Sequence, residues 1–357
     1  MAEPPHHVLS SGQTSALDGP RSSATTHGPD PHHPRRTRGL PDLPDPTRGI
    51  RGVRATVAGA PVSFGVFELT PEGAEVVTPD DMVEALAETG YAGIDLGPVG
   101  YLGRGRELRD RLAGAGLELA GGWIQLPLSD DDAFAASLPE LHASLRVFQE
   151  ASEAGPARLP LPTLADAGSA VRAAAPGRGA EADPLDDAAW SRLVRNTARA
   201  AGITRAAGFE PTFHHHAGTF VESPAEVDRF LDAVDVGLTL DTGHLVIAGG
   251  DPVAAVARWG SWITHLHLKD VDGAELRRVL AAGGGMREVW SSGAFAAFGR
   301  GDVDLASVMT AIEAQGYDGW IVVEQDVLNA PDADIRRFRA ERTEDQRVNR
   351  EALRTWA

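Results

Sequence analysis

The sequence contains no cysteine. Disulfide bonds, thiolate metal sites and cysteine nucleophiles are therefore excluded, so any metal ion would need His, Asp or Glu ligands. This absence fits a reducing compartment. The sequence also lacks a run of about 18 or more apolar residues, as a membrane-spanning helix needs, and an apolar stretch after a basic start, as in a secretory signal. We therefore expect a cytoplasmic protein without a membrane partner.

Basic residues are few relative to acidic ones. The chain has 33 Lys and Arg against 51 Asp and Glu, which gives a formal net charge of −18. This charge repels phosphate backbones, so nucleic acids and anionic membranes are poor partners and a small molecule is expected instead. The 357 residues are 42% hydrophobic, enough for one large α/β domain or two ordinary ones. The sequence is also compatible with a homo-oligomer.

The first part of the chain differs in composition from the rest. Residues 1–52 are rich in Pro, Ser, His and Arg and lack periodic apolar positions. Such a segment cannot bury enough apolar surface to offset the entropy of ordering it, so it is predicted to be a disordered tail. Residues 53–357 are predicted to form the folded domain. Within this domain, the Gly- and Pro-containing stretch Ala173–Asp187 predicts a long loop.

After the tail, short apolar or β-branched runs alternate with helical patterns. The eight candidate strands are Val53–Val62, Gly93–Leu96, Leu117–Leu126, Arg158–Leu164, Gly208–Phe213, Val236–Leu240, Ile263–Leu268 and Trp320–Val323. The helical patterns between them include Asp80–Thr89, Trp190–Ala207, Ser223–Ala233, Pro252–Trp259 and Leu305–Gln315. Repeated β-α units predict a parallel sheet, and eight of them predict an α/β fold that closes as a (β/α)8 TIM barrel. A doubly wound open sheet is the alternative, which the lack of a GxGxxG motif in the first unit disfavours.

Polar side chains follow the last four candidate strands, at the edge where such a barrel carries its chemistry. They are His214, His215 and His216 after the fifth strand, Asp241 and His244 after the sixth, His265, His267, Lys269 and Asp270 on the seventh, and Glu324 and Asp326 after the eighth. Imidazole and carboxylate ligands suit a divalent ion such as Mn²⁺, Co²⁺, Mg²⁺ or Zn²⁺. The sequence therefore predicts a metal site at this rim.

The alternation of side chains along a strand indicates which histidines face the barrel axis. His265 and His267 share one face, and His267 is the favoured site residue because it lies nearer the C-terminal end of its strand. His214 and His216 also share a face, whereas His215 points away and is expected to be structural.

The two carboxylates at the rim differ in how strongly they point to a metal. Asp241 taken alone could equally cap the helix that follows it. Glu324 follows the apolar run Ile321–Val323, where an unpaired carboxylate would be costly unless it met a cation.

Two segments of the second half resemble the xylose-isomerase-like TIM-barrel superfamily of sugar phosphate isomerases and epimerases. These segments are VGLTLDTGHLVIAGGDPVAAVARWGSWITHLHLKDVD and FGRGDVDLASVMTAIEAQGYDGWIVVEQD. Within that superfamily the chain most resembles the inosose (2-keto-myo-inositol) dehydratases. The segments APVSFGVFE, GYAGIDLGPVGYLG and GLELAGGWIQLPL also resemble the first three strands of that subgroup. The resemblance covers about residues 54–330. It implies a role in carbohydrate metabolism, in inositol catabolism for the closest subgroup.

The resemblance implies a divalent ion, with Mn²⁺ or Co²⁺ expected first, held by Glu, Asp, His and Glu from separate strands. Asp241, His267 and Glu324 match the last three ligands, and His214 stands where the family has the first Glu. The implied substrate-binding residues are Asp95, Phe64, Trp123 and Asp270. Asp95 stands where Glu is expected, and Phe64 where Trp is usual.

The chemistry that the resemblance implies is removal of a proton next to a carbonyl, through an enediolate. His216 and His244 are the candidate acid and base, and Lys269 is a candidate to bind a substrate hydroxyl or stabilise the enediolate. Expulsion of a β-hydroxyl would make the chain a lyase acting on 2-keto-myo-inositol or a related cyclic polyol ketone. Return of the proton would make it a sugar (phosphate) isomerase or epimerase acting on a ketose. A non-catalytic sugar-binding barrel is the third hypothesis.

Overall fold

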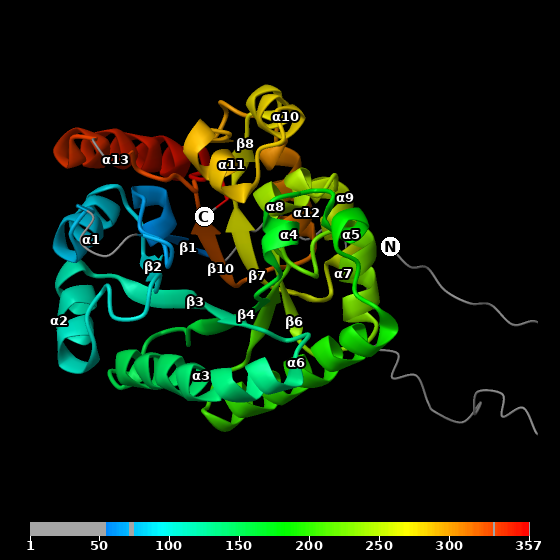
Figure 1. Ribbon diagram of the computed structural model, residues 1–357. Coiled ribbons are helices and arrows are strands. Elements are labelled where there is room, and N and C mark those ends of the chain that lie inside the picture. Colours follow the sequence, from blue (N-terminus) through cyan, green and yellow to red (C-terminus); the bar gives the residue numbers. More distant parts are fainter. Residues whose placement is uncertain (1–54, 71–74, 331–332, 357) are drawn as a thin grey trace, which may run out of the picture. The chain divides into compact units, whose positions relative to one another are not determined.

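The computed structural model of the protein describes residues 55–70, 75–330 and 333–356. The predicted disordered tail lies outside the described residues. In the described part, eight parallel strands close into a barrel in the order β1-β10-β7-β6-β5-β4-β3-β2 (Figure 1). They are β1 (Thr56–Gly59), β2 (Gly93–Asp95), β3 (Glu118–Leu126), β4 (Leu161–Asp166), β5 (Thr212–His214), β6 (Gly237–Asp241), β7 (Ile263–Leu268) and β10 (Trp320–Val323). Each candidate strand overlaps one of these, and the predicted TIM barrel is confirmed.

The helices surround the barrel and connect its strands (Figure 1). The longer ones are α1 (Pro79–Glu88), α2 (Gly105–Ala115), α3 (Asp131–Ser152), α6 (Asp187–Ala206), α7 (Pro224–Leu231), α9 (Pro252–Trp259), α12 (Leu305–Ala314) and α13 (Ile335–Ala352). Shorter ones lie in the segments that follow β1, β4 and β6: η1 (Pro61–Phe64), α4 (Ala170–Ala173), α5 (Gly179–Ala182) and α8 (Thr242–Ile247). Among the described residues, no helix combines the length and the apolar character that crossing a membrane requires.

Local sequence signals set where these helices begin and end. Before α7, the Ser223 hydroxyl accepts a hydrogen bond from the Glu226 amide while the Glu226 carboxylate accepts one from the Ser223 amide, which forms a capping box. After α2, Gly116 adopts a left-handed conformation with φ of 66° and turns the chain into β3.

The alternation along the strands separates a core from a functional interior. On β7, Leu266 and Leu268 belong to the main apolar cluster that includes the surrounding helices, whereas His265 and His267 lie on the opposite face. Val322 of β10 is the register partner of His267 and lies on the same face of the sheet. It belongs to a small apolar cluster that also contains Ala58 and Trp320. The barrel interior therefore contains apolar side chains, and its C-terminal rim carries polar ones.

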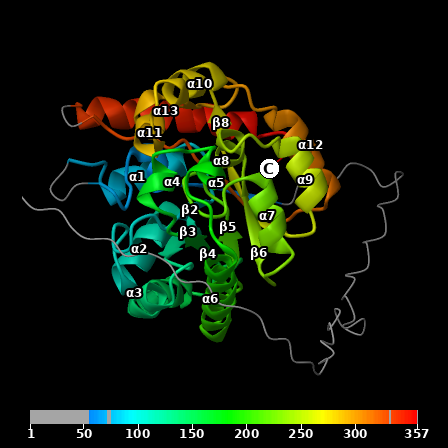
Figure 2. The same cartoon turned by 45° about the vertical axis from the view of Figure 1, so that its right-hand side comes forward.

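Two regions differ from the sequence expectations. Ala173–Asp187, predicted as a long loop, contains the end of α4 and the helical turn α5. Between β7 and α12 the chain forms an unpredicted insertion, built from β8 (Asp270–Val271), α10 (Gly273–Ala281), α11 (Met286–Ser292) and β9 (Phe295–Ala296). Strands β8 and β9 pair antiparallel, and the insertion lies at one edge of the barrel beside α13 (Figure 2). It contributes most of a separate apolar cluster that includes Val271, Met286 and Phe295.

Candidate active site

A cavity of about 350 Å³ opens at the C-terminal ends of the barrel strands. Every strand of the barrel contributes a residue at or just after its end. The polar and aromatic lining residues include Asp95, Trp123, Gln125, Asp166, His214, His216, His244, His267, Lys269, Glu324 and Asp326. This is the face where the sequence predicted the chemistry.

The four predicted metal ligands lie together: His214, His267 and Glu324 line the cavity, and Asp241 is buried directly beside them. The Nε2 atom of His214 is 3.4 Å from Oδ2 of Asp241. The Nδ1 atom of His267 is 3.0 Å from Oε2 of Glu324 and 3.8 Å from Oδ2 of Asp241. Potential ligand atoms of His214, Asp241 and His267 all lie within 4.8 Å of one another, as do those of Asp95, His267 and Glu324. Asp95 is thus a further potential ligand in this cluster.

The donor set fits a divalent cation. His267 is buried, and neither of its ring nitrogens has a hydrogen-bond partner of good geometry within the described part of the chain. Its closest ion pair joins Nδ1 to Glu324, and buried ring nitrogens that lack a well-aligned hydrogen bond call for a ligand or an ion. Because buried imidazoles and carboxylates converge here, these residues form a suitable cage for an ion of the Mn²⁺, Co²⁺ or Zn²⁺ type.

Lys269 supplies a positive charge to the same cluster. Its Nζ atom lies 2.7 Å from Oδ2 of Asp241, 2.7 Å from Oε2 of Glu324 and 3.3 Å from Oδ1 of Asp326. The side chain is buried, and Thr242 fixes its backbone, because the hydroxyl donates to the Lys269 carbonyl and accepts from its amide. Lys269 is therefore held against three carboxylates.

Burial and neighbouring charges shift the pKa values of the carboxylates and histidines in this cluster. Burial opposes ionisation of Asp241 and Glu324, but the Lys269 ammonium lowers the pKa of Asp241, and His267 with Lys269 lowers the pKa of Glu324. Burial lowers the pKa of His214. Burial also disfavours the charged form of His267, but the Glu324 carboxylate outweighs it and raises the pKa of His267. Burial raises the pKa of Asp326 to about 7, against the opposing charge of Lys269.

His216 and His244 form a second histidine group beside the metal cluster. Their ring centroids are 3.6 Å apart, and Nε2 of His244 is 3.5 Å from Oδ2 of Asp326. Burial holds the pKa of both histidines well below the ordinary value, so both are neutral near pH 7. Nδ1 of His216 lies 2.7 Å from the carbonyl oxygen of Ala217. Because a carbonyl can only accept, Nδ1 carries the proton and Nε2 is left as a proton acceptor.

Trp123 and Asp95 lie in the cavity wall. The Trp123 ring centroid is 5.3 Å from that of His214 and 5.1 Å from that of His216. Burial raises the pKa of Asp95 to about 6, and its Oδ1 atom accepts a hydrogen bond from the Leu96 amide. A register shift between Ile94 and Asp95 accompanies this turn of the chain at the end of β2.

The other two predicted substrate-binding residues do not line the cavity. Phe64 is buried in the main apolar cluster, and Phe67 lines the cavity instead, with its ring 5.4 Å from that of Trp290. Asp270 is 0% exposed, and its carboxylate accepts hydrogen bonds from the amides of the insertion and the following loop, Val271, Gly299, Gly301 and Val303. The structure therefore places Phe64 in the apolar core and Asp270 against loop amides, away from the residues that line the cavity.

His215 has a structural position. Its ring is buried, its Nε2 accepts a hydrogen bond from the Asp241 amide at 3.2 Å, and its ring packs against Trp259. It thus links the end of β5 to the end of β6.

Several lining residues were not singled out from the sequence. They are Glu68, Gln125, Asp166, Met286 and Trp290. Asp166 ends β4, so the strand-end rule that selected Asp241 could have found it. Met286 and Trp290 belong to α11 of the insertion, for which the sequence offered no strand-end signal.

Comparison with known proteins agrees with the TIM-barrel fold. The model of the xylose isomerase-like TIM barrel family matches residues 83–341. The chain is 30% identical over 264 residues to an inosose dehydratase of Lacticaseibacillus casei, with 71% of this chain and 84% of the relative covered. It is 33% identical over 261 residues to the rhizopine catabolism protein MocC of Rhizobium meliloti, with 69% of this chain and 74% of the relative covered.

Among solved structures, the probable 3-DHS dehydratase AsbF of Bacillus anthracis has a similar fold. The two superpose with a TM-score of 0.60 at 16% identity, over 84% of this chain and 98% of the other. At this identity the match concerns the fold alone. The family match, the 30% identical relative and the fold agree, and the chain belongs to the xylose isomerase-like TIM barrel family.

Proposed function

We propose that this chain is a divalent-metal-dependent lyase that dehydrates 2-keto-myo-inositol or a closely related cyclic polyol ketone. One observation carries the proposal: a cluster of potential metal ligands lies beside the His216–His244 pair, and all of these residues except Asp241 line the same cavity. The 30% identity to an inosose dehydratase supports the choice of substrate.

His214, Asp241, His267 and Glu324 are the proposed ligands, and Mn²⁺ or Co²⁺ are the proposed ions. A bound divalent ion would supply Lewis acidity towards the substrate carbonyl. The Lys269 ammonium, fixed between Asp241 and Glu324, adds positive charge that offsets the negative charge developing on substrate oxygen.

The cavity suits one sugar-sized ring. Its volume of about 350 Å³ is near the lower end of typical small-molecule sites. Trp123 offers a flat apolar surface to the C–H face of a ring, and Asp95 and Gln125 offer polar atoms to hydroxyl groups.

Two proton transfers complete the reaction. The free Nε2 of His216 takes the proton from the carbon next to the carbonyl, and that electron pair forms the new carbon–carbon double bond. The bond from the β-carbon to its hydroxyl oxygen breaks, and the oxygen leaves with its electron pair. It departs as water after taking a proton from the His244–Asp326 pair, which lies next to His216.

The test uses the full-length protein. Elemental analysis should give about one divalent ion per chain, and the Mn²⁺- or Co²⁺-loaded protein should convert 2-keto-myo-inositol into a product with the ultraviolet absorbance of a conjugated enol-diketone. Bound metal with ketose interconversion and no such absorbance would replace the proposal by an isomerase or epimerase. Sugar binding without metal or turnover would leave a non-catalytic barrel.

A further inference from the structure

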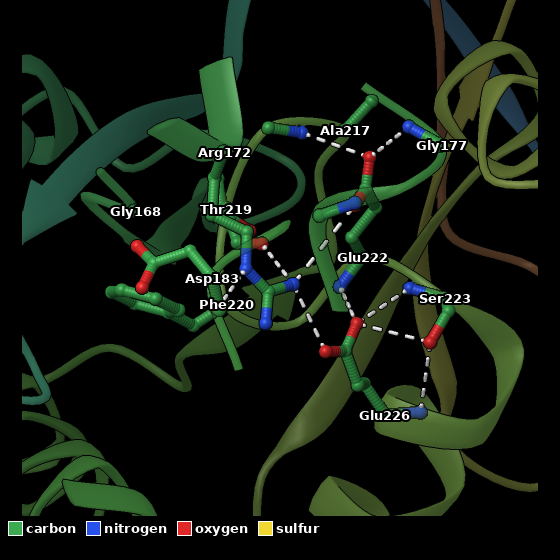
Figure 3. Close-up of polar contacts among 12 residues, drawn as sticks. Gly168, Arg172, Gly177, Asp183, Ala217, Thr219, Phe220, Glu222, Ser223 and Glu226 are labelled. Atoms are coloured by element: carbon green, nitrogen blue, oxygen red, sulfur yellow. Dashed lines mark hydrogen bonds and ion pairs between the residues drawn. The ribbon is translucent and has the colours of Figure 1, made fainter. Parts of the chain in front are cut away.

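Two loops that form one wall of the cavity are joined by a buried ion-pair network. The first loop follows β4 and contains α4 and α5, and the second follows β5 and leads into α7. The network connects Arg172 of α4 with Glu222 and Glu226 near the start of α7 (Figure 3). We call it the Arg172–Glu222 clamp.

Arg172 reaches from the first loop to the second. Its side chain is 1% exposed. Within the first loop, Nε donates to the carbonyl oxygen of Asp183 at 2.8 Å. Across to the second loop, Nη1 donates to the carbonyl oxygen of Thr219 at 3.1 Å and to Oε1 of Glu226 at 2.9 Å (Figure 3). The guanidinium also lies over the Phe220 ring, 5.0 Å from its centroid.

Glu222 makes the reciprocal connection. Its carboxylate accepts a hydrogen bond from the amide of Gly177 in the first loop (Figure 3). It also accepts hydrogen bonds from the amides of Gly179 in the first loop and Gly218 in the second. Oε2 of Glu222 is 3.9 Å from Nη1 of Arg172. Each loop therefore provides one charged side chain that binds backbone groups of the other loop.

The two loops are in close contact at Gly168 and Gly218. A Cβ atom added to Gly168 would lie 2.4 Å from the carbonyl oxygen of Gly218. Gly218 has φ of +85°, and a Cβ there would lie 3.2 Å from Cα of Ala173 and 3.1 Å from the Met286 side chain of the insertion. Because the contact involves backbone atoms, a shift of one loop displaces the other.

Hydrogen bonds through Thr219 connect the clamp to the backbone of His216. The Thr219 carbonyl is bound by Arg172, while the Thr219 amide and hydroxyl donate to the His216 carbonyl at 3.1 and 2.9 Å. The His216 amide donates to the Val221 carbonyl at 3.1 Å, next to Glu222. Both sides of the turn that carries His216 are therefore fixed by the clamp.

From this connection we infer that Arg172 and Glu222 are positioning residues for His216. They hold its imidazole at one place in the cavity wall through Thr219 and the backbone of the turn. The inference rests on the proposed function, in which His216 takes the substrate proton. A buried ion pair that serves stability alone could be replaced by apolar side chains of similar volume. Here, by contrast, Arg172 donates to backbone carbonyls and Glu222 accepts from backbone amides on both loops.

The test compares Arg172→Lys and Glu222→Gln with the wild-type protein. Lysine keeps the charge but cannot donate to Asp183, Thr219 and Glu226 in the same geometry. Glutamine keeps the shape, but its amide nitrogen cannot accept from the glycine amides. We expect kcat to fall roughly tenfold to a hundredfold in each variant, since misplacing a catalytic group by about 1 Å costs as much as a hundredfold. KM and bound metal should change less than twofold.

A second readout does not depend on activity. Hydrogen exchange of residues 167–183 and 214–223 should accelerate in both variants, and the His216 ring signals in NMR spectra at fixed pH should shift. The control is Arg205→Gln, which removes the exposed pair with Glu210 at the far end of α6 and should leave every readout unchanged.

The outcomes separate the inference from the proposed function. Unchanged kcat and unchanged His216 signals in folded Arg172→Lys or Glu222→Gln protein would overturn the inference. An equal rise in KM and loss of bound metal would also overturn it, because the clamp would then support the whole site. If the wild-type protein lacks dehydratase activity, the proposed function fails, but the shift of the His216 signals and the loop exchange still support or overturn the positioning of His216.

Discussion

The Nζ atom of Lys269 lies 2.7 Å from Oδ2 of Asp241, and both side chains are buried. Asp241 has a second role, because its Oδ1 accepts the His244 amide at the start of α8. The sequence left an even choice between a helix cap and a site residue. In the structure Oδ1 caps α8, and Oδ2 lies against Lys269 and His214. Asp241 therefore connects Lys269 and the proposed metal ligands to α8, the helix that carries His244.

Asp241→Asn should remove metal binding without unfolding the barrel. Asparagine can still accept the His244 amide, but its neutral amide is a much weaker ligand than a carboxylate. We expect bound metal to fall below about a tenth of the wild-type content, with activity lower by roughly a hundredfold or more. Elemental analysis and thermal melting measure the two effects. Glu210→Gln, on the exposed pair with Arg205, is the control, and a fully loaded Asp241→Asn protein would contradict the ligand assignment.

Trp123 should act as a wall of the cavity rather than as a proton donor. Its ring lies against His214 and His216. Trp123→Phe keeps an aromatic face and should change kcat/KM by less than about tenfold, whereas Trp123→Ala should lower it by a hundredfold or so, about 3 kcal/mol. Steady-state kinetics at constant metal loading measures both. Equal losses in the two variants would point instead to the indole nitrogen, which lies 3.4 Å from Oε1 of Gln125.

The barrel and its rim could be predicted because both follow from local rules. Parallel strands buried on both faces appear as short apolar runs, and the functional side chains of such barrels lie where those runs end. That is why His267 and Glu324 could be selected from the sequence, and why the structure brings them within 3.0 Å. The same rule could have found Asp166 at the end of β4.

The missed features depend on contacts between distant segments. Phe64 and Phe67 both follow β1, and only the fold of η1 decides that Phe67 faces the cavity. Asp270 directly follows the site residue Lys269, yet its carboxylate turns to the amides of the loop that ends the insertion. The turns within Ala173–Asp187 are held by hydrogen bonds to the side chains of Arg172 and Glu222. They therefore need no apolar pattern, and no sequence signal indicated them.

Asp270→Ala should lower stability rather than substrate affinity. It would leave four backbone amides without their carboxylate acceptor, among them those of Gly299 and Gly301. We expect the free energy of unfolding to fall by about 3 kcal/mol, with KM for the folded protein within twofold of the wild type. Denaturant unfolding and kinetics measure these quantities. Asp304→Ala, which removes only the exposed cap of α12, should cost about 1 kcal/mol. A large rise in KM without destabilisation would restore Asp270 as a substrate-binding residue.

Asp166 should make the stability of the protein depend on pH. Burial raises the pKa of this carboxyl to about 6 from an ordinary value of 3.8, although the amides of Gly168 and Phe220 and the Arg172 guanidinium oppose the shift. Between these two values the unfolded chain has already lost the proton while the folded protein keeps it. The contribution of Asp166 to stability is therefore greatest below about pH 4, falls as the pH rises to about 6, and is constant above, with a total change of at most about 3 kcal/mol.

Asp166→Asn tests this dependence because asparagine does not titrate. Its amide oxygen can accept the Gly168 and Phe220 amides that Oδ2 accepts in the wild type. The melting temperature of the variant minus that of the wild type should therefore rise between about pH 4 and pH 6 and level off above. Asp130→Asn, on the exposed cap of α3, controls for the loss of a charge at a helix start. A difference that stays flat or falls across this range would mean that Asp166 is ionised in the folded protein throughout, and that the Arg172 guanidinium outweighs its burial.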